Sequence, residues 1–310
     1  MITNTAKATL IAAESPLFGN VRFKYDVENS KAEYYKRHFN SFEDFLHYVS
    51  YNHNELERYD SHKGSYDFTR TTSFEQAIKY AEGGWKEGLK EINYYENISD
   101  LEYGSQALKN IWDVENDVTG DFVDIESYIQ GVPECMARFN EKRDKKFADI
   151  FVKTDYNCYV KQEDVFRRGV EILKMVDALE KHGIKTRVTG YVVAKSWRSK
   201  REIKYLTTVV LKDYHQQLEL DYLVFPLAHV SFLRRLWFAM LEKEDIDFRK
   251  KFQGKSLIGY GGCGMLGEYP DLLWKEDIHG TRLFVIDDPA SSVYSEEAIK
   301  RQVKEVLKAS

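Results

Sequence analysis

The chain has 310 residues, 43% of them hydrophobic and 31% charged, so it can form one large domain or two modest ones with a sizeable core. Aromatic residues make up 14% and proline occurs only 5 times, which excludes a disordered, collagen-like or low-complexity chain. The formal net charge of −5 excludes nucleic-acid binding through bulk charge, so such binding would require a local basic patch. A membrane-surface role is disfavoured by the same net charge. The sequence contains no apolar run of about 18 residues, so no transmembrane helix is predicted.

The N-terminal segment and the cysteines predict a cytoplasmic protein. The apolar stretch at residues 8–13 is too short for a signal peptide. Cys135, Cys158 and Cys263 are odd in number and widely spaced, so neither a disulfide framework nor a zinc knuckle is expected. Free thiols are typical of a reducing cytoplasm. We predict no metal and no other cofactor.

Residues 1–145 are predicted to form a mostly helical, aromatic-rich region. Alternating apolar and basic residues at 21–25 indicate a strand. Capping residues and apolar periodicity indicate helices at residues 42–49, 73–83, 85–92 and 105–118. The second of these begins with a capping box, with Ser at the N-cap and Gln at N3, and ends at a Gly-Gly pair.

Residues 146–254 are predicted to form an α/β core. A strand at 147–154, a long amphipathic helix at 162–182 and a strand at 184–194 make a βαβ-type unit. A third strand at 203–211 can continue this unit or pair antiparallel with the second strand as a hairpin. An apolar helix at 227–241 is expected to cover the sheet.

Residues 255–310 are predicted to pack on this core and complete one compact unit. They contain a Gly-rich loop, a strand at 283–286 and a helix at 296–308. The predicted fold class is α/β, or α+β, with a small central sheet flanked by helices.

Three segments together resemble an uncharacterised family encoded mainly by tailed bacteriophages and prophages. They are SFEQA followed by GWKEG (73–88), GVPECM (131–136), and RRG followed by VDALE (167–180). The likeness covers residues 73–245. It implies a phage origin and a location in the cytoplasm of a host bacterium, and it carries no mechanism.

The βαβ-type unit is also similar to the opening of a von Willebrand A domain. That family places Asp-x-Ser-x-Ser after the first strand to hold a divalent metal, whereas this chain has Asp155, Asn157 and Tyr159 there. A Tyr ligand does not suit a hard cation such as Mg²⁺. The resemblance therefore implies a degenerate von Willebrand A or Rossmann-like core without the metal. The alternative is that Asp155 and Asn157 simply form a turn after the strand.

Other motifs lack the context that catalysis or cofactor binding requires. The loop at residues 259–267 contains a literal GxGxxG, but no long helix follows to receive a pyrophosphate. His53, His62 and Asp60 share a polar segment, where solvated side chains are the ordinary case. Cys158 as a nucleophile would need a histidine brought close by the fold. We therefore predict a non-enzymatic protein, with an enzyme whose site is assembled from distant residues as a remaining alternative.

Basic and aromatic residues alternate in four segments, at 22–25, 34–39, 197–201 and 248–252. Single-stranded nucleic acid is bound by this mixture, because cations follow the phosphates and rings stack on the bases. The alternative is that these are ordinary half-buried strands and helices, with charged residues outside and rings inside. The predicted binding residues are Arg22, Lys24, Tyr25, Tyr35, Lys36, Arg37, Trp197, Arg198, Lys200 and Arg201.

These observations predict a phage-encoded, non-enzymatic accessory protein that binds single-stranded DNA. Its second expected partner is a phage polymerase, or another phage or host protein of transcription or replication, which it would recruit. The alternative is a protein-interaction module with a degenerate von Willebrand A-like core and no nucleic-acid role.

Overall fold

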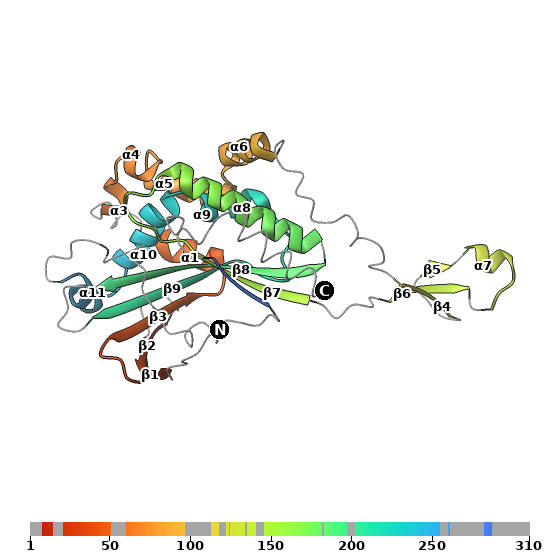
Figure 1. Ribbon diagram of the computed structural model, residues 1–310, viewed down its shortest axis with the longest axis horizontal. Coiled ribbons are helices and arrows are strands. Elements are labelled where there is room, and N and C mark those ends of the chain that lie inside the picture. Colours follow the sequence, from red (N-terminus) through yellow and green to blue (C-terminus); the bar gives the residue numbers. More distant parts are fainter. Residues whose placement is uncertain are drawn as a thin grey trace.

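A computed structural model describes most of the chain. The described residues are 8–14, 21–50, 60–96, 113–117, 122–123, 125–133, 135–140, 146–181, 183–196, 202–254, 260 and 282–286. They form a seven-stranded mixed sheet, a layer of helices and a separate three-stranded sheet (Figure 1). The predicted α/β class is confirmed.

The main sheet has the strand order β1-β2-β3-β9-β8-β7-β10. Its strands are β1 (Ala8–Glu14), β2 (Arg22–Val27), β3 (Glu33–Phe39), β7 (Lys146–Lys153), β8 (Ile184–Ser196), β9 (Ile203–Lys212) and β10 (Arg282–Ile286). Strands β10, β7 and β8 run parallel, and β9 pairs antiparallel with β8. The hairpin alternative for the third strand is therefore the observed one, because the short connection through residues 197–202 suits an antiparallel pair.

The N-terminal region supplies three strands to this sheet in addition to its helices. Strand β2 confirms the predicted strand, and β3 joins it to the central region by pairing parallel with β9. The sheet is therefore larger than the small one expected. Strands β1 and β3 were not predicted, because β1 is a brief apolar stretch and β3 is dominated by basic and aromatic residues.

The prediction of a helix over residues 105–118 is wrong for residues 113–117. These form strand β4 (Asp113–Asp117), which pairs antiparallel with β6 (Met136–Asn140). Strand β5 (Phe122–Val123) completes the small sheet, and α7 (Ile125–Ile129) follows it. Strand pairing outweighs local preference here, as is common for β structure.

Helices cover one face of the main sheet (Figure 1). They are α1 (Phe42–Ser50), α3 (Asp60–Lys63), α4 (Tyr66–Thr69), α5 (Phe74–Gly83), α6 (Lys86–Glu96), α8 (Gln162–Lys181), α9 (Leu220–Ala228), the π-helix η1 (Phe232–Trp237), α10 (Phe238–Glu242) and α11 (Ile246–Gln253). The predicted N-caps are confirmed, because Ser41 Oγ accepts from Asp44 N and Ser73 Oγ accepts from Gln76 N. Helix α8 packs closely on α9 at Gly169, where a Cβ would lie 2.5 Å from Ala228 Cβ.

The single helix predicted over residues 227–241 is instead broken. Helix α9 ends at Ala228, His229 is extended (φ −119°, ψ 128°), and η1 begins at Phe232. Pro226 lies in the last turn of α9 and donates no backbone hydrogen bond there. Among the described residues, no single helix is long and apolar enough to cross a membrane, and α9 with residues 232–242 passes that test only as a pair bent by 72°.

Candidate functional site

The fold brings three of the four basic-aromatic segments, 22–25, 34–39 and 248–252, together at one end of the main sheet. Strands β2 and β3 are neighbours, and α11 packs across them, with the Arg22 guanidinium 4.0 Å from the centre of the Phe248 ring. The rings of Tyr35 and Phe248 meet edge to face at 5.1 Å. Ser196 Oγ donates to the carbonyl of Phe252, which attaches the end of β8 to α11 at the left of Figure 1.

A buried ion cluster lies beneath α11. Arg37 is fully buried and donates to both carboxylate oxygens of Glu244, at 2.7 and 2.8 Å. Arg22 Nη1 donates to Glu244 Oε2 at 2.6 Å and also pairs with Asp245 Oδ2 at 2.7 Å. Burial disfavours the charge on Arg37, but Tyr205 and Glu244 hold its pKa above the ordinary value. Both arginines thus connect the sheet to the segment before α11.

Most of the described residues predicted to bind DNA are buried. Arg22, Tyr25, Tyr35, Lys36 and Arg37 have at most 5% of their surface exposed, which leaves little ring face for stacking on bases. The half-buried alternative therefore holds for the rings but not for Arg22, Lys36 and Arg37, which are buried as well. Glu244 and Asp245 balance the charges of the two arginines. Only the side chain of Lys24, 30% exposed, reaches the surface among the described members of the set.

The remaining predicted residues, Trp197, Arg198, Lys200 and Arg201, lie outside the described residues. Their position in the chain is nevertheless informative. They fall between Ser196, which is bonded to α11, and Glu202, whose carbonyl accepts from Glu33 N at 2.8 Å. The described residues on either side of the segment therefore contact α11 and the first residue of β3.

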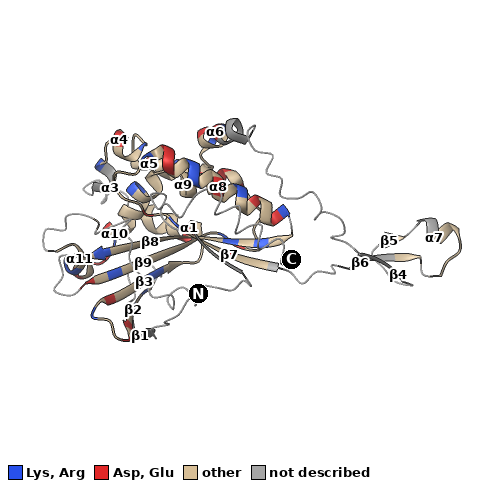
Figure 2. Ribbon diagram, in the orientation of Figure 1, with Lys and Arg blue, Asp and Glu red and all other residues tan. Residues whose placement is uncertain are grey.

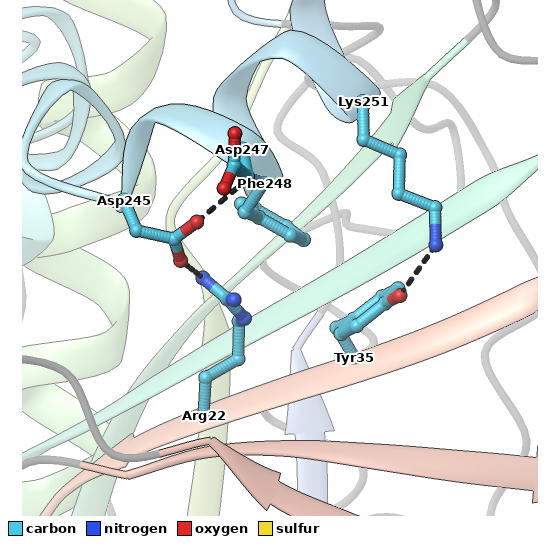
Figure 3. Close-up of a pocket in the computed structure, with 6 residues that line it drawn as sticks. All are labelled: Arg22, Tyr35, Asp245, Asp247, Phe248 and Lys251. Carbon is cyan, nitrogen blue, oxygen red and sulfur yellow. Dashed lines mark hydrogen bonds and ion pairs between the residues drawn. The ribbon is translucent and has the colours of Figure 1, made fainter.

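A pocket of about 370 Å³ opens where α11 meets strands β2 and β3 (Figure 3). Its lining residues are Arg22, Tyr35, Asp245, Asp247, Phe248 and Lys251. Two cations and two carboxylates balance in formal charge, so the pocket suits a neutral or dipolar group better than a bare anion. Figure 2 likewise shows basic residues on α11 close to acidic ones.

Sequence reasoning noted the basic-aromatic run in α11 but missed this pocket. Asp245 is the N-cap of α11, and its carboxylate accepts from Phe248 N at 2.8 Å. An Asp followed by an apolar residue and a charged run is a recognisable helix start. That signal could have predicted α11, although not its packing against β2 and β3.

Three hydrogen-bond donors converge on one oxygen of Glu33 at the edge of the pocket. Lys24 Nζ lies 3.3 Å from Glu33 Oε2, the Tyr35 hydroxyl donates to it at 2.9 Å, and Lys251 Nζ also donates to it. Burial alone would raise the pKa of Glu33, but the hydrogen bonds from Lys251 and Tyr35 outweigh it and lower this pKa to about 2.

This depressed pKa predicts a pH-dependent contribution to stability. Since the carboxylate has an ordinary pKa of 4.5 and a folded-state pKa of about 2, its stabilisation is present above pH 4.5 and is lost as the pH falls towards 2. The difference in unfolding free energy between wild type and Glu33→Gln, measured by urea denaturation, should be constant above pH 5 and shrink below it. A difference that grows on acidification would contradict this interpretation.

The metal position of the von Willebrand A resemblance has a different arrangement here. Asp155 is fully buried, and its Oδ2 accepts from Val193 N at 3.3 Å. Asn157 is exposed, and its Oδ1 accepts from Tyr159 N at 3.3 Å, the geometry of an Asx turn. No group of three His, Cys, Asp or Glu side chains in the described part of the chain is placed to hold a metal ion.

The fold and the pocket define an α/β protein with a mixed seven-stranded sheet and a charge-balanced site under its last described helix. The chain belongs to the family described as Domain of unknown function (DUF7192), which it matches over residues 19–310. Neither a curated protein nor a solved structure matches the chain.

Proposed function

We propose that the protein binds single-stranded DNA at the end of the sheet where the basic-aromatic segments meet. The observation that carries this proposal is their convergence. Segments 22–25, 34–39 and 248–252 are in direct contact, and segment 197–201 is flanked by residues bonded to α11 and to β3. The contact between three separate segments with the same binding chemistry supports a shared site, to which the proposal adds segment 197–201.

The burial of the rings changes how such a site would work. Lys250 and Lys251 are exposed on α11 and Lys24 is partly exposed, so these lysines can reach phosphates, Lys24 and Lys251 after releasing Glu33. Tyr35 and Phe248 form the pocket wall instead of stacking platforms. In this proposal an unpaired base enters the charge-balanced pocket, while Trp197 and its basic neighbours supply stacking and further phosphate contacts.

A fluorescence anisotropy titration with labelled oligo-dT at low salt tests this proposal. The double variant Trp197→Ala, Arg198→Ala should bind about 5- to 150-fold more weakly, since stacking on one base contributes about 1–3 kcal/mol. The control variant Lys181→Ala, Lys185→Ala removes two exposed cations from the α8–β8 connection and should bind like wild type. Equal affinity in all three proteins would show that the 197–201 segment is not part of the site.

The wider role is also a proposal. The likeness of three segments to phage-encoded proteins supports an accessory protein in an infected bacterium, where bound single-stranded DNA would bring phage transcription or replication machinery to its template. A phage polymerase is the partner this role requires. Co-sedimentation of the protein with such a polymerase only when single-stranded DNA is present would support it.

A second candidate function is a protein-interaction module. The observation that favours it is a set of exposed apolar side chains on β5, on α7 and in the segment after α7, namely Val123, Tyr128, Ile129 and Val132. The parallel β7–α8–β8 unit is compatible with the degenerate von Willebrand A-like core proposed for this role. Absence of any DNA binding at low salt would favour this candidate over the first.

A further inference from the structure

The donors around Glu33 come from three different elements. Lys24 belongs to β2, Tyr35 to β3 and Lys251 to α11, and all three point at the same carboxylate oxygen. Both ammonium groups also lie over the Tyr35 ring, at 5.7 and 5.4 Å from its centre. The cations are therefore held around the hydroxyl by cation–π contacts as well as by Glu33.

Two ammonium groups and a hydroxyl surround one carboxylate oxygen of Glu33. The same set of donors would suit a phosphate oxygen. Charged hydrogen bonds of this kind are made equally to carboxylates and phosphates. The Glu33 side chain retains 16% exposure, and the Lys251 side chain has 39%, so the cluster opens to solvent. Lys251 and Tyr35 also line the pocket, which places the anion position at its edge.

We propose that Lys24, Lys251 and the Tyr35 hydroxyl form a phosphate-binding site that the Glu33 carboxylate occupies when no ligand is bound. This inference rests on the proposed function, for which it names the group recognised: a backbone phosphate next to the base in the pocket. On binding, the phosphate displaces Glu33 towards solvent and takes over its three donors. Glu33 thus acts as an internal competitor that weakens binding of nucleic acid.

The variant Glu33→Gln tests this site with a labelled oligo-dT titration at low salt. Removing the competing charge should tighten binding by about three- to tenfold, the range expected when two partly exposed ion pairs no longer have to be broken. Glu171→Gln is the matched control. It removes the same charge from a partly exposed residue of α8 whose carboxylate pairs with Lys174, so its affinity should change less than about twofold.

Lys251→Met provides a second variant that does not depend on the Glu33 substitution folding well. It should weaken binding. It should also lower the slope of the logarithm of the association constant against the logarithm of the salt concentration by about 0.7, the contribution of one phosphate contact. If wild type binds oligo-dT but neither Glu33→Gln nor Lys251→Met changes its affinity, the phosphate site is refuted and the proposed function stands.

Inorganic phosphate separates the two possible sources of the anion. Isothermal titration of phosphate into Glu33→Gln and wild type should show measurable binding that is tighter in the variant. If no protein binds oligo-dT but Glu33→Gln binds phosphate, the site serves another phosphorylated ligand and the DNA function fails. Absence of both kinds of binding would overturn the phosphate site itself.

Discussion

Glu244→Gln should lower the free energy of unfolding by about 3–5 kcal/mol, the cost of removing one partner from a buried ion pair. Glu244 has a fully buried side chain that forms ion pairs with Arg37 and Arg22 and accepts a hydrogen bond from the Tyr205 hydroxyl. A neutral amide cannot balance the positive charges of the two guanidinium groups. Arg37 also has no exposed surface through which water could solvate its charge. The change would therefore loosen α11 from β2 and β3.

Urea denaturation followed by circular dichroism measures this effect. Asp247→Asn is the control, because it removes an exposed carboxylate from α11, the helix that follows Glu244, and should change the unfolding free energy by no more than about 0.5 kcal/mol. Similar stability in Glu244→Gln and Asp247→Asn would contradict the described ion cluster. Loss of stability in Glu244→Gln alone would confirm it.

Arg235→Lys should lower the unfolding free energy by about 2–4 kcal/mol, because several buried acceptors lose their donors. The Arg235 guanidinium donates to the carbonyls of Ser61, Gly64 and Thr71 and to the hydroxyls of Thr69 and Thr71. These bonds attach the α3–α4 segment to η1. A lysine ammonium has only three donors at a single point and cannot reproduce this fork.

The exposed Arg167 on α8 offers a matched comparison. Arg167→Lys makes the same chemical change at the surface and should leave the urea midpoint unchanged within error. Limited proteolysis should additionally show faster cleavage between residues 61 and 71 in Arg235→Lys than in wild type. Equal midpoints for the two variants would mean that the Arg235 hydrogen bonds do not hold this segment.

The local elements with strong signals were predictable from the sequence. Helix α8 has the expected apolar stripe, with Val165, Ile172 and Val176 buried, and α5 begins at its capping serine. The strands on either side of α8 also lie where predicted. In these segments local preference, periodicity and tertiary packing all favour the same structure.

The candidate site was only partly predictable, because its residues are joined over long distances in the sequence. The basic-aromatic segments were identified, but Arg37 and its partner Glu244 are 207 positions apart, and nothing local to either residue indicates the pair. Alternation in β2 and β3 could not show that the arginines face a carboxylate under α11. Glu33 was missed for the same reason, since its role depends on α11 bringing Lys251 to it.

The affinity of the wild-type protein for short oligo-dT, measured by anisotropy across a range of salt concentrations, shows whether the protein binds single-stranded DNA through its phosphates. Binding through phosphates releases counterions, so the logarithm of the association constant should fall linearly with the logarithm of the salt concentration, by about 0.7 per phosphate contacted. We expect saturable binding at low salt with a slope corresponding to a few contacts, and weaker binding to a duplex of the same length. No binding at low salt, or an affinity that does not depend on salt, would contradict this expectation.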